Sequence, residues 1–209
     1  MDTFLRAAGM SDRDLLLLAH ANALYERAYG KQQVIMSGDD EEDLAAVLLQ
    51  GTAFLESINL ENQRRILECY EPRDVFRKKC FPNVESRSYY VASRKPCRVL
   101  FVHENRLEMS GQPGLALKAF LEERSLAVSG QRAYLHLDIL GQRTLRQKLL
   151  SYFSFCVRQQ NAVVFTLPFS LTDCADYLAV DRSAMMRELK KMKEEGLVEI
   201  QGRRVRLHR

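Results

Sequence analysis

The 209-residue sequence contains no tryptophan, only five prolines, and no apolar run long enough to cross a bilayer. Its longest apolar stretches, such as LLLLAHA near the N-terminus, are far shorter than the ~20 residues that a membrane helix needs. The start, MDTFLRAAGMSDRD, lacks the continuous apolar region of a secretory signal peptide. We therefore expect a cytoplasmic protein without membrane contact, and the 46% of apolar residues suffices for a buried core.

Cysteines and histidines are few and scattered. The five cysteines form no CxxC pair, and the four histidines form no HxH or HExxH motif. Disulfide frameworks and locally spaced zinc or iron–sulfur sites need such pairs. The sequence thus predicts buried, reduced thiols and no metal. A metal-dependent enzyme of the cupin type would need clustered His and carboxylate ligands on facing strands, and it stays a remote alternative.

Charge is unevenly distributed along the chain. From residue 141 to the end there are 13 Lys and Arg against 7 Asp and Glu, whereas residues 1–140 carry 18 against 20. A basic C-terminal third behind a slightly acidic body is typical of a module that binds a polyanion.

The pattern along the chain predicts an α+β protein of three segments. Residues 1–112 begin with a helical stretch over 1–28, whose apolar face includes Leu24. Short β-prone runs with frequent turn residues follow, typical of an antiparallel β-barrel or jelly roll. The spacing of SINLENQRRILECYEP leaves strand and helix both open there. Residues 113–140 predict a long helix, and residues 141–209 predict a small helical domain that ends in a β-hairpin.

The long helix carries a candidate dimer interface. Leu121, Val128 and Leu135 repeat every seven residues, and Ile139 continues the stripe. Such a stripe packs in a core or pairs with the same helix of a second copy. We expect it to form a homodimer.

The stretch LTDCADYLAVDRSAMMRELKKMKEEG predicts two short helices joined by a tight turn. Ser170 and Asp173 form a capping-box pattern that starts the first helix at Leu171. Asp181 is a good N-cap for the second, which runs to about residue 195, where Gly196 ends it. Ala175 and Ala179 are small residues four apart, as two closely crossing helices would need. This is the layout of a helix-turn-helix, although a basic surface hairpin remains the alternative.

The second helix has a predicted reading face and a predicted buried face. Arg182, Ser183 and Arg187 lie near its N-terminal end, and their hydrogen-bonding groups suit base edges and phosphates. The opposite side carries Met185, Leu189 and Met192. The hairpin that follows places Arg203 and Arg204 at its tip.

The stretch from LTDCADYL to GRRVRL resembles the winged helix-turn-helix of the Crp/Fnr family of bacterial transcription regulators. The order of barrel-like strands, long helix and helix-turn-helix is similar along nearly the whole chain. The resemblance implies that Arg182, Ser183 and Arg187 read bases and that Lys190 contacts a phosphate. Many relatives have Glu at the middle reading position, so the half-site sequence does not carry over to Ser183.

The N-terminal half departs from the family pattern. The stretch RSYYVASRKPCRVLFV is similar to the segment that binds a cyclic-nucleotide phosphate, which would assign that role to Arg87 and Ser88. The preceding glycines are replaced by Arg73 and Arg77, and the acid that would bind the ribose is replaced by Lys78. These changes argue against ordinary cyclic AMP binding. Haem ligation through Cys80 or His103 stays open.

The resulting functional hypothesis is a homodimeric regulator that binds double-stranded DNA at an inverted repeat and senses an unidentified signal. One alternative is a ligand-independent regulator, whose barrel serves only dimerisation or contacts with the transcription machinery, such as RNA polymerase.

Overall fold

The computed structural model describes residues 2–40, 42–81 and 87–208, without the side chains of Asp2, Arg87, Ala127 and Val128. The chain forms two compact units, Met1–Gln131 and Arg132–Arg209. Helix α4, Gly111–Gly141, contributes to both, so the division falls inside the long helix.

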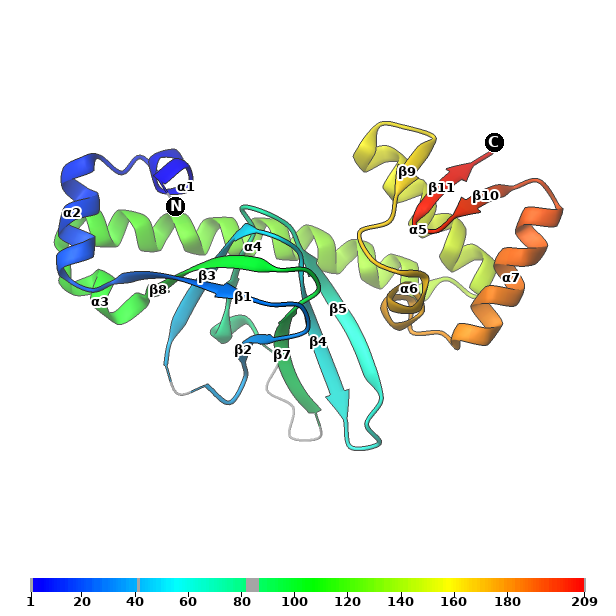
Figure 1. Cartoon of the computed structure of the whole chain (residues 1–209), viewed down its shortest axis with the longest axis horizontal. Coiled ribbons are helices and arrows are strands. Elements are labelled where there is room, and N and C mark those ends of the chain that lie inside the picture. The colour runs from blue at the N-terminus through cyan, green and yellow to red at the C-terminus, as the bar shows by residue number, and fades with distance from the viewer. Residues whose placement is uncertain (1, 41, 82–86, 209) are drawn as a thin grey trace. The chain divides into compact units, whose positions relative to one another are not determined.

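Two four-stranded antiparallel sheets form the body of the N-terminal unit (Figure 1). One sheet has the order β1-β8-β3-β6, made of Leu24–Tyr29, Cys97–His103, Leu44–Gln50 and Val75–Arg77. The other has the order β2-β7-β4-β5, made of Val34–Ser37, Arg87–Ser93, Ala53–Asn59 and Arg64–Tyr70. The sheets do not close into a barrel, and the arrangement is a jelly-roll-like sandwich.

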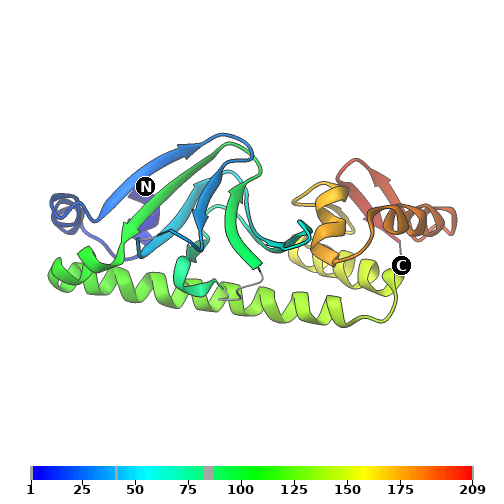
Figure 2. The ribbon, with the colours of Figure 1, turned by 90° about the horizontal axis from the view of Figure 1, so that it is seen from below.

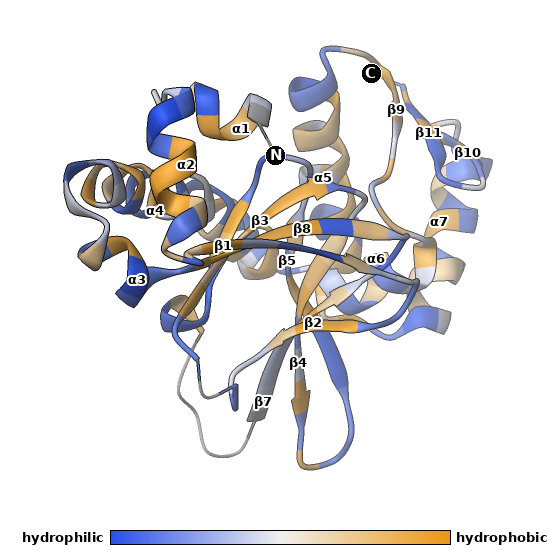
Figure 3. Cartoon of the chain, turned by 60° about the vertical axis from the view of Figure 1, so that its left-hand side comes forward, coloured by the Kyte–Doolittle hydropathy of each residue, from blue (hydrophilic) through white to orange (hydrophobic). Residues whose placement is uncertain are grey.

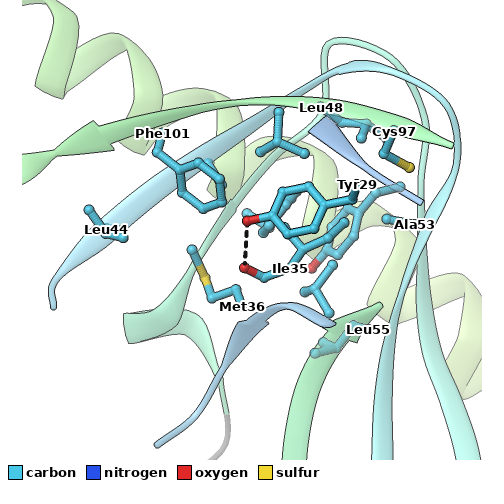
Figure 4. Packing of buried hydrophobic residues seen from close by; sticks show 14 residues of the cluster. Tyr29, Ile35, Met36, Leu44, Leu48, Ala53, Leu55, Cys97 and Phe101 are labelled. Carbon is cyan, nitrogen blue, oxygen red and sulfur yellow. Dashed lines mark hydrogen bonds between the residues drawn. The ribbon is translucent and has the colours of Figure 1, made fainter. Parts of the chain in front are cut away.

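An apolar core fills the space between the two sheets (Figure 4). Met36, Leu55 and Val91 come from one sheet, and Leu48 and Phe101 come from the other. At its edge, the hydroxyl of a buried tyrosine, Tyr29, donates to the carbonyl oxygen of Ile35 at 3.5 Å. The sandwich thus has the buried inner faces that alternating strands produce.

A second core covers the opposite face of the β1-β8-β3-β6 sheet. Helices α1 (Asp2–Ala7), α2 (Asp12–His20), α3 (Glu104–Met109) and the first part of α4 supply its helical side. Figures 1 and 2 show α2, α3 and the start of α4 gathered at one end of the sandwich. With both faces covered, β3 and β8 are apolar along most of their length, as Figure 3 shows.

The structure corrects one expectation for the N-terminal unit and decides one that the sequence left open. Leu24 begins strand β1 rather than extending a helix, because α2 ends at His20 and β1 pairs with β8 from Leu24 to Tyr29. The ambiguous stretch before Tyr70 contains strand β5, which pairs with β4. The first outcome depends on β8, a strand distant in sequence, whereas the second depends on the neighbouring strand β4.

The C-terminal unit packs three helices against a small sheet. The helices are α5 (Leu145–Gln160), α6 (Leu171–Leu178) and α7 (Arg182–Glu194). The sheet has the order β10-β11-β9, made of Val198–Gln201, Arg204–Leu207 and Val164–Thr166. Its core includes the aromatic rings of Tyr152, Phe153, Phe165, Phe169 and Tyr177. None of the helices in the described residues combines the length and apolar character needed to span a membrane.

The five thiols have different exposures. Cys97, Cys156 and Cys174 are buried and Cys69 is partly buried, but Cys80 is exposed in the short 3-10 helix η1, Lys78–Cys80. The expectation of buried thiols is therefore wrong for Cys80, because this surface turn leaves its side chain uncovered. Within the described ranges, no three His, Cys, Asp or Glu side chains gather as a metal site.

Candidate nucleic-acid interface

Helix α6 begins where the capping pattern predicts. The Ser170 hydroxyl accepts a hydrogen bond from the backbone N–H of Asp173 at 3.1 Å and donates to its carboxylate at 2.8 Å. The first of these bonds satisfies a backbone N–H that the start of a helix leaves without a partner. Cys174, Ala175 and Leu178 are buried and attach α6 to the core of the unit.

The turn between α6 and α7 depends on one left-handed residue. Ala179 has φ 51° and ψ 50°, and it is exposed rather than packed between the helices. Ala175 is buried, as close helix approach would need, whereas the prediction is wrong for Ala179, whose small side chain suits the backbone conformation. Asp181 then caps α7, since its carboxylate accepts the N–H of Ala184 at 2.7 Å.

Helix α7 has two distinct faces. Met185, Leu189 and Met192 follow the i, i+4, i+7 spacing and are buried. The predicted reading residues Arg182, Ser183 and Arg187 are exposed, and so is Lys190. In the part of the chain that the structure describes, the first three make no side-chain hydrogen bond or ion pair, whereas Lys190 lies 3.8 Å from Glu194. The helix therefore presents uncompensated guanidinium groups to solvent.

Sequence reasoning missed Met186 on the same surface. Its side chain is 44% exposed and lies between Ser183 and Arg187 in the sequence. The only indication is that position 186 falls outside the buried i, i+4, i+7 pattern. An exposed apolar group here can contact a thymine methyl group in a major groove.

The hairpin after α7 forms the predicted wing. Gly196 ends α7 with φ 74°, and Gly202 turns the hairpin with φ 59°. Strand β11 also pairs with β9, a third strand that the sequence did not predict. Arg203 donates to the backbone carbonyls of Leu167 and Pro168 at 3.4 and 3.3 Å, so its guanidinium rests on the loop before α6.

An open groove of about 520 Å³ lies on the wing. Its charged lining consists of Lys193, Arg204 and Arg206 with one carboxylate, Glu199. Arg204 was predicted to bind DNA, and the sequence places Lys193 where it would meet backbone phosphate or water. Arg206 was not singled out, and its alternation with buried Val205 was the available indication.

Solved structures share this fold at low sequence identity. FixK2 from Bradyrhizobium japonicum matches with a TM-score of 0.69 and 21% identity, over 89% of this chain and 93% of that chain. A CooA mutant from Carboxydothermus hydrogenoformans matches with a TM-score of 0.73 and 14% identity, over 90% of this chain and 85% of that chain.

Sequence comparison agrees with the fold. A family model described as a Crp-like helix-turn-helix domain matches residues 145–209, which span α5 to β11. The transcriptional activator protein FnrL of Cereibacter sphaeroides is 23% identical over 190 residues, or 86% of this chain and 75% of that protein. These comparisons identify residues 145–209 as a Crp-like helix-turn-helix domain. The helix-turn-helix prediction is confirmed at the level of the domain.

The predicted dimer stripe on α4 faces inward at two of its positions. Leu121 is 2% exposed in the core against the sheet, and Ile139 is fully buried. Leu135 is half-buried, and the side chain of Val128 lies outside the described residues. Assigning Leu121 and Ile139 to a dimer interface is therefore wrong, because their own chain already covers them.

A different apolar line on α4 is exposed. Leu126 and Leu137 are 67% and 65% exposed, and Ala133 is exposed between them. With Gly130, these residues have the 4-3-4 spacing of a coiled-coil seam. A Cβ atom at Gly130 would meet no atom within 4 Å, so the helix is open at that point.

The segment that departs from the Crp/Fnr ligand pattern keeps one glycine-like feature. Arg73, which replaces a family glycine, has φ 80°. A bulky residue in this region is strained, and the surrounding structure must compensate for it. Here the backbone N–H of Arg73 donates to the Leu48 carbonyl at 2.7 Å, and its own carbonyl accepts from Arg124 at 3.3 Å.

Arg77, at the second replaced glycine, forms an internal ion-pair cluster. Its guanidinium donates to both carboxylate oxygens of buried Glu104, at 2.6 and 2.7 Å, and to Glu122 of α4 at 3.1 Å. Lys79 also bonds Glu104, at 3.2 Å. Burial raises the pKa of Glu104, but the bonds from Arg77 and Lys79 outweigh it and hold that pKa below its usual value.

The remaining effector candidates lie on strand β7. Ser88 is exposed and faces Ile58 in the β4–β7 ladder. The side chain of Arg87 lies outside the described residues. Their assignment to an effector phosphate stays a prediction.

Proposed function

We propose that this Crp/Fnr-type regulator is a homodimer that reads an inverted repeat in double-stranded DNA with helix α7. The observation that carries the proposal is the exposed, uncompensated face of Arg182, Ser183 and Arg187 opposite a fully buried face. Arginine bonds guanine O6 and N7 in a bidentate manner, and Met186 adds an apolar contact for thymine. Lys190, Arg203 and Arg204 then bind phosphates along the flanking backbone.

The dimer forms through the line of Leu126, Gly130, Ala133 and Leu137 on α4. Two exposed leucines at the ends of a 4-3-4 pattern with small residues between them favour close pairing of two helices. Two-fold symmetry in the protein then requires half-sites about one or two helical turns apart.

Cyclic AMP is not the effector in this proposal. A backbone that approaches a ligand closely needs glycine, whereas Arg77 occupies that position and is bound to Glu104 and Glu122. Saturating cyclic AMP should therefore leave the melting temperature unchanged, because a ligand of the folded state would raise it. The N-terminal sandwich either senses another signal or acts without ligand, through contacts with RNA polymerase or other transcription machinery.

The DNA test begins with duplexes selected from a random pool by the full-length protein. Replacing Arg182 or Arg187 with Ala should weaken binding to the selected duplex by about 1–3 kcal/mol and change random-duplex binding little. Arg13→Ala, which removes an exposed arginine of α2, is the matched control and should do neither. If Arg187→Ala leaves the ratio of selected to random affinity unchanged, α7 is not the reading helix.

The dimer test uses Leu137→Lys with Leu60→Lys as its control, since Leu60 is 86% exposed in the turn between β4 and β5. Burying each leucine contributes about 1.5–3 kcal/mol, and the dimer contains two copies of Leu137. Sedimentation should therefore show a dimer that Leu137→Lys weakens and Leu60→Lys does not. A monomeric wild-type protein would contradict the proposal.

A further inference from the structure

One arginine of α5 connects that helix to two points on α7. The Arg146 Nε donates to Glu188 Oε1 at 2.5 Å. Its two terminal nitrogens donate to the two carboxylate oxygens of Glu195, at 2.6 and 2.8 Å. These bonds raise the pKa of Arg146 and lower that of Glu195, as expected for charge-assisted pairs.

We propose that Arg146 is a positioning residue for DNA reading, which sets the rotation of α7 about its own axis through Glu188 and Glu195. The inference rests on the proposed function, because the proposed function assigns the reading of bases to α7. No contact between Arg146 and DNA is required. Arg146, Glu188 and Glu195 are together called the α7 clamp below.

The spacing of the two carboxylates supports a rotational role. Glu188 and Glu195 are seven residues apart, so they lie two turns apart on one side of the helix end. The buried Met185, Leu189 and Met192 fix how deeply α7 packs, but apolar contacts are non-directional. Bonds at fixed angles to two points along the helix define its orientation, and with it the direction of Arg182 and Arg187.

The clamp also controls a charge beside the reading face. Glu188 directly follows Arg187, and its side chain is 19% exposed. Without Arg146, the Glu188 carboxylate beside Arg187 would lose its positive partner and repel phosphates. The clamp therefore keeps Arg187 available for bases while it neutralises the acid beside it.

The first experiment compares Arg146→Ala with Lys148→Ala in the full chain. Lys148 lies two residues further along α5, so its removal changes the net charge equally. Binding to selected and random duplexes is measured over a salt series. Arg146→Ala should lower the ratio of selected to random affinity at least tenfold, and Lys148→Ala should leave that ratio unchanged. Arg146→Lys keeps the positive charge, so random-duplex affinity should equal that of the wild type. The ratio of selected to random affinity should stay low, because lysine lacks the planar fork that bonds both carboxylates.

The second experiment removes the acceptors instead of the arginine. Glu188→Gln combined with Glu195→Gln makes the surface of α7 more positive, so random-duplex affinity should rise. If the clamp positions α7, the ratio of selected to random affinity should fall in the same protein. A simple charge effect would strengthen binding to both duplexes equally, and that outcome would overturn the proposal.

Binding measurements distinguish a failure of the proposed function from a failure of the clamp. A wild-type protein that does not distinguish selected from random duplexes removes the proposed function itself. A wild type that does distinguish them, with Arg146→Ala and the Glu-to-Gln pair keeping the same ratio, overturns only the role of the clamp. If a melting curve shows that Arg146→Ala does not fold, the Glu188→Gln and Glu195→Gln double variant alone tests the role of the clamp.

Discussion

Arg77 in the N-terminal unit and Arg187 in the C-terminal unit carry the same guanidinium group in opposite surroundings. The side chain of Arg77 is 9% exposed and bonds two carboxylates. Arg187 is exposed, and the structure records no hydrogen bond or ion pair for it in the described residues. Similarly, in the N-terminal unit, Glu56 is buried against Arg94 at 2.7 Å and accepts from the Tyr90 hydroxyl at 3.0 Å.

The contrast shows that the number of arginines does not measure the capacity to bind a polyanion. A guanidinium that is bonded to carboxylates in a buried site attracts a phosphate only weakly, because the carboxylates neutralise its charge. An exposed, unpaired guanidinium keeps its full charge. The overall charge of +4 conceals this difference. Arg77 thus stabilises the N-terminal unit, whereas the exposed charge of Arg187 in the C-terminal unit stays available to a polyanion.

The largest expected effect tests the two arginines directly. Arg77→Ala leaves the buried Glu104 carboxylate without its bidentate partner, which should lower the free energy of unfolding by about 3–5 kcal/mol. Arg187→Ala, at an exposed position, should change it by less than about 0.5 kcal/mol. Since the chain has no tryptophan, urea unfolding is best followed by circular dichroism. Equal losses in the two variants would contradict the comparison.

A smaller effect should appear in the pH dependence of stability. The pKa of Glu104 is below its usual value in the folded protein, so its ionised form stabilises the fold above the unfolded pKa of about 4.3. That contribution is lost as the pH falls through the folded pKa. In Arg77→Ala, the buried Glu104 without its bidentate partner favours the neutral carboxyl, so lowering the pH should recover part of the lost stability instead of reducing it. Unfolding free energies measured between about pH 3 and pH 7 test this. Parallel pH profiles of the wild type and Arg77→Ala would show that the Arg77 cluster does not cause the pH dependence.

The smallest effect concerns an exposed cation of α7. Lys190→Ala should weaken selected and random duplexes alike, since a phosphate contact carries no sequence information. The slope of log affinity against log salt should fall by about 0.9 for one lost contact. A change in sequence discrimination instead would place Lys190 among the base-reading residues and narrow the contrast with Arg187.

The sequence predicted the C-terminal unit more completely than the N-terminal unit, for a physical reason. The caps at Ser170, Asp181 and Gly196 depend on groups within three or four residues, and each lies where the sequence indicated. By contrast, Arg77 bonds Glu104, 27 residues further along the chain, and no local sequence pattern predicts such a pair.

Helix α4 shows the same limit within a single element. Its sequence contains two apolar lines, one through Leu121 and one through Leu126 and Leu137. Which line is covered depends on the position of the β1-β8-β3-β6 sheet, and periodicity does not contain that information. The helix itself was predictable, whereas its outward face was not.

The exposed thiol of Cys80 has a practical consequence for spectroscopy. A maleimide dye reacts with accessible thiols, and three of the other four cysteines are buried while the fourth is partly covered. Because Cys80 directly follows Lys79, which bonds Glu104, an attached fluorophore would lie beside the Arg77 cluster. The native chain therefore supplies its own optical reporter of that region, without an engineered cysteine.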